Sequence, residues 1–383
     1  MSFSPNGQFL SASIDKAGPN KEGYGRESVV ELWHRDAPSS LKKIAELPGE
    51  HSGQVRWAPD SRWLSVGAGK GWDFFDSKTG KVLRHCPLNQ SIGAMAPSGR
   101  RLVCWNFEKQ TAELAEQATG KTICKLDCGG IYIVWSSFAV SPDGRVVAGD
   151  LTSENIFLWD AFTGKKIGTL KGHRGSIKSL CFSADGRFLV SGSTDTTVLI
   201  WDYRKMIQQP PFKQGELSAE RLQEIWKDLQ SSDAALGYAA VANLVQAPDQ
   251  ALALLRQKVV ATTAKDHARF QAWIDKLDND FFQERDRAQT ELHAVRDLAE
   301  PVLRQALTRK LSQEAKGRIE SILAKLTDSP APLWLGLAHL RAFETLELIG
   351  SAAARKLIED IATGLPASPL TQEAHRTLDR MRQ

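Results

Sequence analysis

The sequence has few of the features that metal chemistry, secretion or membrane insertion require. Its five cysteines are an odd number, and their spacing matches no metal motif: Cys124 and Cys128 have three residues between them, where a zinc knuckle usually has two. No apolar run approaches the roughly 18 residues of a membrane span. The N-terminus has neither the charged nor the apolar region of a signal peptide. We therefore expect reduced thiols, no metal, no membrane partner and a cytoplasmic location.

A strong excess of charge of one sign is also missing. The 383 residues include 49 Lys and Arg against 45 Asp and Glu, a net charge of +4. The balance is +5 for residues 1–212 and −1 for the rest, so neither part forms the basic stripe that is typical of nucleic-acid-binding proteins. The eight histidines are scattered, and no nucleophile–base pair or phosphate-binding loop stands at a meaningful spacing. The sequence thus predicts no nucleic-acid partner, no cofactor and no catalytic residue.

Two short sequence motifs recur through residues 1–205. The first is a Pro-Asp-Gly-like turn, and the second is an apolar strand that ends in an aromatic–acid pair and is followed by Thr-Gly-Lys. The turn occurs at 4–7, 58–61, 96–99, 141–144 and 183–186. The second members of the pairs fall at positions 34, 76, 116, 160 and 202, in steps of 42, 40, 44 and 42 residues. A period of about 40–45 residues is that of four-stranded propeller blades.

The residue types within each period fit this interpretation. In Pro-Asp-Gly, proline presets φ, aspartate bonds its own backbone, and glycine accepts a positive φ, which together make a tight turn. The runs 187–191 and 197–201 are rich in β-branched and aromatic residues, as strands between packed blades should be. Asp195 and Thr196 lie between these runs, where a hairpin turn is needed.

The last unit resembles the WD40 repeat family almost throughout. Gly172-His173, Ser183-Ala184-Asp185-Gly186, Ser191-Gly192-Ser193, Asp195 and Trp201-Asp202 carry the resemblance. In that family a buried His, Ser, Asp and Trp form a hydrogen-bonded chain, and the resemblance implies that His173, Ser191, Asp195 and Trp201 take these places. A Ser-His-Asp hydrolytic triad is the alternative, but it would leave Trp201 unexplained. Phe75 and Ala115 replace the tryptophan in units 2 and 3, so we expect apolar packing there.

The number of units is lower than the resemblance implies. WD40 propellers usually have seven blades, and only five units are found here. The first unit begins at the end of its first strand. We therefore expect an incomplete ring and an N-terminally truncated member of the bacterial type of WD40 protein. Blade faces without a neighbour would be apolar, which favours self-association through the open propeller edges.

Residues 218–383 predict an all-α domain. The stretch 206–217 contains Pro210-Pro211 and Gly215 and is expected to be a linker; beyond it, β-branched runs give way to helix-forming residues. Ser218 is a good N-cap, Pro301 fits a first helical turn, and Gly350 fits a C-cap.

Two arrangements of these helices remain open. Alanine–leucine pairs recur 48 and 54 residues apart at 240/244, 288/292 and 342/346, and Asp280, Arg285 and Ala288 resemble the first helix of a HEAT repeat. One interpretation is a HEAT-like stack of helix pairs, and the other is a compact bundle with its own core. The expected fold class is therefore an all-β propeller of about five blades followed by an all-α helical-repeat or bundle domain.

Two functions from different classes fit these features. The first is a non-catalytic protein–protein interaction scaffold, because propellers present loops around a rigid disc and helical solenoids present a concave face. The second is the C-terminal regulatory fragment of a larger enzyme, for example of the kinase type, whose catalytic module lies upstream. The residues do not identify the partner protein.

Overall fold

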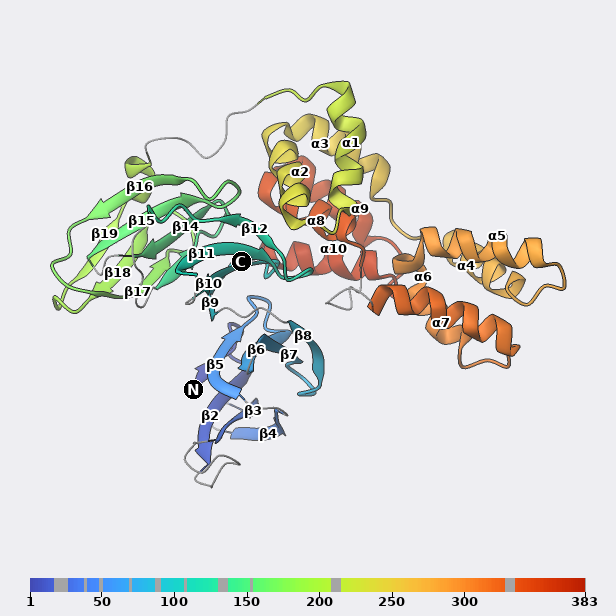
Figure 1. Ribbon diagram of the computed structural model, residues 1–383, viewed down its shortest axis with the longest axis horizontal. Helices are drawn as coiled ribbons and strands as arrows, with labels where there is room; N and C mark the ends of the chain where they lie inside the picture. Colours follow the sequence, from blue (N-terminus) through green and yellow to red (C-terminus); the bar gives the residue numbers. More distant parts are fainter. Residues whose placement is uncertain are drawn as a thin grey trace. The chain divides into compact units, whose positions relative to one another are not determined.

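The computed structural model describes residues 1–16, 27–37, 40–47, 51–68, 71–86, 91–106, 109–129, 137–151, 154–207, 215–327 and 335–382. They fall into two compact units, Met1–Lys213 and Gln214–Gln383. Strands build the first unit and helices build the second (Figure 1). The expected succession of WD40-like sheets and an α-helical region is confirmed.

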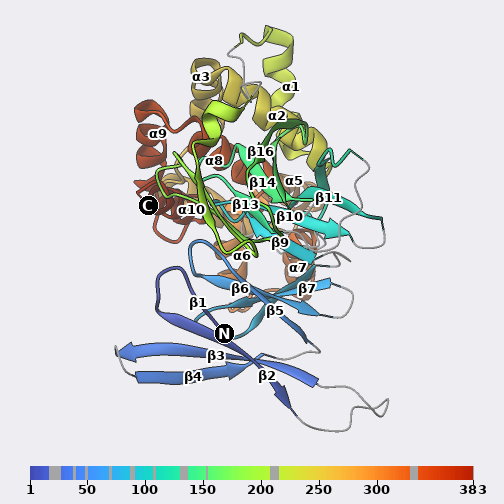
Figure 2. The same ribbon diagram turned by 90° about the vertical axis from the view of Figure 1, so that its left-hand side faces the viewer.

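The described strands of the first unit form four antiparallel sheets, which we divide in chain order into blades 1 to 5; blades 1 and 2 share the first, eight-stranded sheet, joined where Ser28 of β3 pairs with His51 of β5. Blade 1 contains β1 (Ser2–Phe3), β2 (Phe9–Lys16), β3 (Glu27–Ala37) and β4 (Ser40–Glu46). Blade 2 contains β5 (His51–Trp57), β6 (Trp63–Ala68), β7 (Gly71–Asp76) and β8 (Val82–Cys86). Blade 3 contains β9 (Ser91–Met95), β10 (Arg101–Asn106), β11 (Thr111–Glu116) and β12 (Thr122–Lys125). Figure 2 shows β2, β3 and β4 side by side in blade 1.

The last two blades differ in their number of strands. Blade 4 contains β13 (Phe138–Val140), β14 (Val146–Asp150), β15 (Asn155–Asp160) and β16 (Lys166–Lys171). Blade 5 contains β17 (Ile177–Phe182), β18 (Leu189–Ser193) and β19 (Val198–Trp201). In the described part of the chain β19 pairs with β18 alone, and no strand pairing links blade 5 to blade 1. The sheets therefore form an open series with an unpaired strand edge at β19.

Apolar side chains hold successive blades together. Phe9 and Leu32 of blade 1 share a core with Leu64 of blade 2, and Trp72 of blade 2 shares one with Leu102 of blade 3. Blades 4 and 5 meet through a cluster that includes Ile156, Leu158, Leu189 and Tyr203. Strands β10, β11 and β15 are buried on both faces at nearly every position. Burial on both faces explains why β10 and β15 contain the continuous apolar runs 102–105 and 156–159, whereas β11 buries Glu113 and Glu116.

Side-chain hydrogen bonds close the turn that follows the aromatic–acid pair of the second repeated motif. In blade 4 the Asp160 carboxylate accepts hydrogen bonds from the backbone N–H groups of Phe162 and Thr163 and from the Thr163 hydroxyl. Asp76 does the same for Lys78 and Thr79 in blade 2. The glycine that follows each of these turns has a positive φ, +67° at Gly80 and +69° at Gly164. In blades 2 and 4 the Asp-x-x-Thr-Gly pattern therefore marks the entry to the outer strand.

The helices of the second unit form two groups. Helices α1 (Ala219–Gln230), α2 (Ala234–Gln246), α3 (Pro248–Lys258), α8 (Leu337–Ile349), α9 (Ala352–Ala362) and α10 (Pro369–Arg380) form the first. Helices α4 (Ala264–Lys276), α5 (Phe282–Ala294), α6 (Arg296–Ala306) and α7 (Gln313–Thr327) form the second, around their own apolar cluster. The second group is inserted in the sequence between α3 and α8 (Figure 1).

Helix α8 is the centre of the first group. It contacts α1, α2, α3, α9 and α10, so residues more than 100 positions apart pack together. Arg341 of α8 is 1% exposed, and its guanidinium donates to the carbonyl oxygens of Leu229 and Ser231 at the end of α1, both at 2.8 Å. Gly237 leaves the space for this side chain, because a Cβ there would lie 2.2 Å from the Arg341 Cζ. A solenoid contacts its sequence neighbours only, so the HEAT-like stack is not confirmed.

The helix ends agree with most of the expected capping residues. The Ser218 side chain accepts from the backbone N–H of Arg221 at the start of α1, and Gly350 ends α8 with a φ of +62°. The expectation for Pro301 was wrong. Only Val295 separates α5 from α6, so α6 begins at Arg296 and Pro301 lies inside it rather than in its first turn. A proline there removes one backbone hydrogen bond of the helix.

Two glycines with the same backbone conformation allow the cost of backbone strain to be measured apart from the cost of a clash between blades. Gly7 and Gly164 have nearly equal φ values of +67° and +69°, but a Cβ at Gly7 would meet nothing within 4 Å, whereas one at Gly164 would lie 1.9 Å from the Lys125 carbonyl oxygen of blade 3. We expect Gly7→Ala to cost about 1 kcal/mol through the left-handed backbone alone. Gly164→Ala should cost clearly more. Urea unfolding followed by tryptophan fluorescence measures both, and equal losses would contradict the packing argument.

Asp150 makes a pH-dependent contribution to stability. Burial raises the pKa of its carboxyl group from 3.8 to about 6, although it accepts a hydrogen bond from the Ser137 N–H at 2.5 Å. Between pH 4 and 6 the folded chain thus holds a proton that the unfolded chain releases, and this contribution falls as the pH rises. Asp150→Asn keeps an acceptor and does not titrate.

We therefore expect the stability of Asp150→Asn relative to the wild type to rise by up to about 3 kcal/mol from pH 4 to pH 7. Urea unfolding of both proteins at a series of pH values measures this difference. A difference that does not change with pH would show that Asp150 is ionised in the folded chain at pH 4.

Candidate functional site

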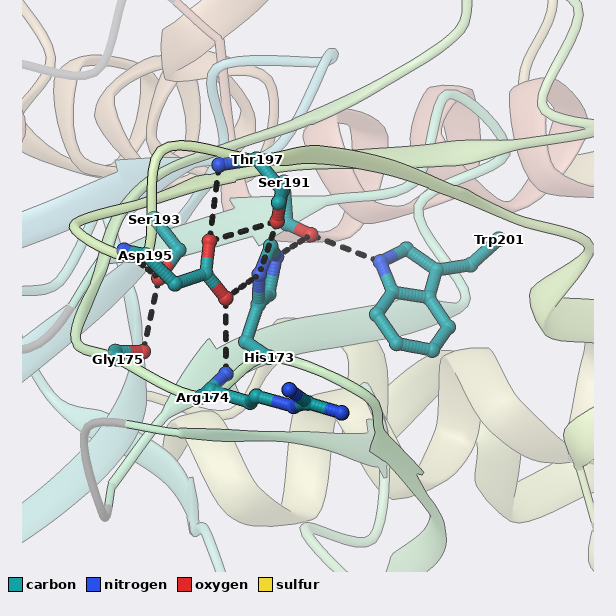
Figure 3. A network of polar contacts seen from close by, with 8 residues as sticks. All are labelled: His173, Arg174, Gly175, Ser191, Ser193, Asp195, Thr197 and Trp201. Carbon is teal, nitrogen blue, oxygen red and sulfur yellow. Dashed lines mark hydrogen bonds and ion pairs between the residues drawn. The ribbon is translucent and has the colours of Figure 1, made fainter.

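The four predicted residues lie together in blade 5. His173 precedes β17, Ser191 lies on β18, Asp195 lies in the turn between β18 and β19, and Trp201 ends β19. His173 Nε2 is 2.7 Å from Ser191 Oγ, and His173 Nδ1 is 2.9 Å from Asp195 Oδ2. The indole Nε1–H of Trp201 donates to Ser191 Oγ at 2.8 Å. Figure 3 shows the four side chains in one continuous chain of contacts.

The chemistry of the groups sets the direction of these hydrogen bonds. An ionised carboxylate only accepts, so His173 Nδ1 carries the proton and donates to Asp195. His173 Nε2 is then an acceptor. The Ser191 hydroxyl donates to His173 Nε2, and the Ser191 oxygen accepts the hydrogen bond from the Trp201 indole. The order of donation is Trp201, Ser191, His173, Asp195. Every polar atom in this buried chain therefore has a partner, as the low dielectric of a protein interior requires.

Asp195 also orders the loop around the network. Its carboxylate accepts from the Thr197 hydroxyl at 2.6 Å and from the backbone N–H groups of Arg174 and Thr197 at 2.8 and 2.9 Å (Figure 3). The hydrogen bond from the Thr197 side chain, followed by the one from the Arg174 backbone, holds the pKa of Asp195 well below its usual range. The carboxylate thus stays ionised and fixes the orientation of the His173 ring.

This geometry does not suit hydrolysis. Ser191 is fully buried, with an exposed fraction of 0%, and its oxygen already contacts both the imidazole and the indole. The His173 side chain is also fully buried. A nucleophilic serine needs a free path to a substrate carbonyl, which the indole of Trp201 occupies here.

Blade 4 fills the equivalent space with an aromatic ring instead of a serine–histidine pair. The alignment of β14–β15 with β18–β19 places Gly149 where blade 5 has Ser191, and Trp159 where it has Trp201. The ring of Phe138 fills that space, because a Cβ at Gly149 would lie 2.5 Å from Phe138 Cδ1. The Trp159 Nε1–H donates instead to the Asp127 carbonyl of blade 3 at 2.8 Å. In units 2 and 3, Phe75 and Ala115 are both fully buried in apolar clusters.

One face of blade 5 carries exposed apolar side chains. Val198 and Ile200 of β19 are 67% and 69% exposed, and they point to the same side of the strand because side chains alternate. Ile200 pairs across the sheet with Val190, which pairs with the exposed Cys181. The opposite face, with Leu189 and Trp201, packs on blade 4. Sequence periodicity did not reveal this difference, because β15 and β19 have similar sequences.

Other candidate chemistry is sparse in the ranges that the structure covers. They contain no group of three or more His, Cys, Asp or Glu side chains that could hold a metal ion. The five cysteines are free thiols, and burial raises the pKa of Cys124 to about 12. None of the helices within these ranges has both the length and the apolar character that a membrane crossing needs.

Comparison with known proteins agrees with the blade assignment. Residues 164–202, which include all four network residues, match the family "WD domain, G-beta repeat". A Periodic tryptophan protein 2 homolog of Schizosaccharomyces pombe is 46% identical over 71 residues, which are 18% of this chain and 8% of that protein.

Longer matches have lower identity. A Guanine nucleotide-binding protein subunit beta of Zea mays is 28% identical over 189 residues, 44% of this chain and 48% of the relative. The corresponding Saccharomyces cerevisiae subunit is 23% identical over 203 residues, 51% of this chain and 46% of the relative. The chain thus spans at most about half the length of these relatives.

Loss of one network member should destabilise blade 5. We expect His173→Ala to lower the unfolding free energy by about 1–3 kcal/mol, because it leaves Ser191 and Asp195 without their shared partner in a buried site. Trp201→Phe keeps most of the apolar contact and removes only the N–H donor, so it should cost less. Urea unfolding measures both changes, and an unchanged midpoint for His173→Ala would contradict a stabilising role for the network.

Proposed function

We propose that this chain is a non-catalytic scaffold for protein–protein interaction. The uncovered face and edge of blade 5 are the observation that carries the proposal. The relatives give independent support, since the maize and yeast proteins are each named as the β subunit of a guanine nucleotide-binding protein, which is one chain of an assembly. The partners of this chain are taken to be other proteins rather than nucleic acid or membranes, and its compartment to be the cytoplasm, where five free thiols persist.

The contrast between β19 and its equivalents supports an interaction role. Ile156 and Leu158 of β15 align with Val198 and Ile200 and are both fully buried, because blade 5 covers them. The same positions of β19 lie in solvent. Large exposed apolar patches mark association surfaces, and an unpaired strand edge adds backbone donors and acceptors that another strand can satisfy.

Self-association through this surface is the specific form that we propose. A second copy carries the same apolar side chains, so the exposed blade 5 faces of two copies can pack on each other and bury Val198 and Ile200. The resulting interface is of the isologous type, in which one patch meets its own copy. The alternative function, a regulatory C-terminal part of a larger enzyme, would use the same surface to contact a catalytic module.

Two substitutions on β19 test the proposal. We expect the wild-type chain to sediment at masses above 42.3 kDa, with the average mass rising as the concentration increases. The double variant Val198→Lys/Ile200→Lys should weaken association at least tenfold, because it places two charges in the contact. Analytical ultracentrifugation over a hundredfold concentration range measures this.

Val260→Lys is the matched control. Val260 is 60% exposed and lies between α3 and α4, in the other unit, so its replacement should leave the mass distribution unchanged. A wild-type chain that stays monomeric at every concentration would refute self-association at blade 5. Equal association of the wild type and the β19 double variant would place the contact elsewhere.

A further inference from the structure

The helical unit contains a groove between α1 and α3. These two helices each contact α2 and α8 and leave between them a cavity of about 450 Å³. Leu222 and Trp226 of α1 and Leu254 of α3 give it partly buried apolar walls, and Gln223, Gln250 and Gln257 line its sides. The Trp226 ring is held in place by an edge contact with His339, with centroids 5.7 Å apart. The groove therefore combines an apolar floor with amide side chains.

At one end of the groove, a glutamine side chain binds a backbone segment of the chain itself. The Gln250 side chain accepts from the backbone N–H of Leu217 at 2.8 Å and donates to the Leu217 carbonyl oxygen at 3.0 Å. An N–H and a C=O of one residue point to the same side only when the backbone is extended. Gln250 thus gives Leu217 the pair of hydrogen bonds that a neighbouring β-strand would give.

The rest of the groove has the same kinds of side chain, amides beside apolar groups, but no described backbone segment is bound to them. Gln257 lies seven residues after Gln250, two helical turns or about 10.5 Å further along the same face of α3. Gln223 lies on α1, across the groove. Within the part of the chain that the structure describes, neither of these two amides has a hydrogen-bond partner. Leu222, Trp226 and Leu254 stand between them and are only partly covered.

We propose that this groove binds an extended peptide segment of a partner protein. One apolar side chain of the peptide fills the space between Leu222, Trp226 and Leu254. The amide of Gln257 pairs with the backbone of a neighbouring peptide residue, as Gln250 pairs with Leu217. A helical ligand does not fit this arrangement, because its backbone N–H and C=O groups are already bonded within the helix.

The proposal concerns the helical unit alone and does not depend on blade 5. It can be tested with the full chain and a phage-displayed library of random 12-residue peptides. The selected sequence is synthesised with a fluorescein label, and binding is measured by fluorescence anisotropy. We expect the selected peptides to share one apolar or aromatic residue and to bind without gaining helical circular dichroism.

Three changes locate the contact. Leu254→Glu should weaken binding at least tenfold, and Gln257→Ala, at an exposed position that does not endanger folding, at least fivefold. N-methylation of the peptide residue that pairs with Gln257, found by methylating each residue in turn, should weaken binding as much as Gln257→Ala does. The matched control is Leu236→Glu, at a leucine of α2 that is 42% exposed and lies outside the groove. It should leave the affinity unchanged.

Three results would overturn the proposal. The first is a library that yields no peptide above background. The second is a peptide whose affinity is the same for the wild type, Leu254→Glu and Gln257→Ala. The third is a peptide that becomes helical on binding and tolerates N-methylation at every position in the groove. Loss of self-association in the β19 double variant has no bearing on any of these outcomes, so the two proposals can fail separately.

Discussion

Burial of apolar side chains between successive sheets is the interaction on which the first unit depends. A four-stranded blade has two faces, and neither can be left in water without losing roughly 25 cal/mol for each Å² of apolar surface. Strands β10, β11 and β15 meet this constraint by packing on a neighbour at both faces. In the described part of the chain, β19 belongs to the same series but has a neighbouring sheet on one side only, and its two outward apolar residues lie in solvent. The interaction surface of blade 5 is thus a direct consequence of the force that builds the other blades.

The interiors of blades 4 and 5 are stabilised by chemically different contacts. Blade 5 uses a polar chain from Trp201 to Asp195, in which each donor finds an acceptor. Blade 4 keeps the tryptophan but replaces the serine by Gly149, and the ring of Phe138 occupies the vacated space. A buried polar network stabilises a protein only when each of its polar groups has a partner. When one of its residues is replaced, apolar packing in the same space is the more stable arrangement. The difference between blades 4 and 5 therefore leaves the indole N–H of each tryptophan with an acceptor, the Asp127 carbonyl oxygen for Trp159 and Ser191 Oγ for Trp201.

The helical unit depends on a central helix rather than on a repeat. α8 contacts five other helices, and its buried Arg341 satisfies carbonyl oxygens at the end of α1, which otherwise have no partner within that helix. α1 and α3 both lie against this centre without covering each other's facing side chains, which leaves the groove between them. The arrangement of the first helical group around α8 thus creates the groove that we propose as a peptide site.

The sequence by itself determined the blades, their period and the helical character of the second unit, because turns, strand ends and helix caps depend on local residue types. The resemblance of the last unit to the WD40 repeat also pointed to His173, Ser191, Asp195 and Trp201, which the structure brings together in blade 5. The tertiary structure alone decided the rest. The exposure of Val198 and Ile200 depends on the absence of a neighbouring sheet in the described chain, although Ile156 and Leu158 have nearly the same local sequence. The central place of α8 depends on contacts across more than 100 residues, which no local pattern encodes.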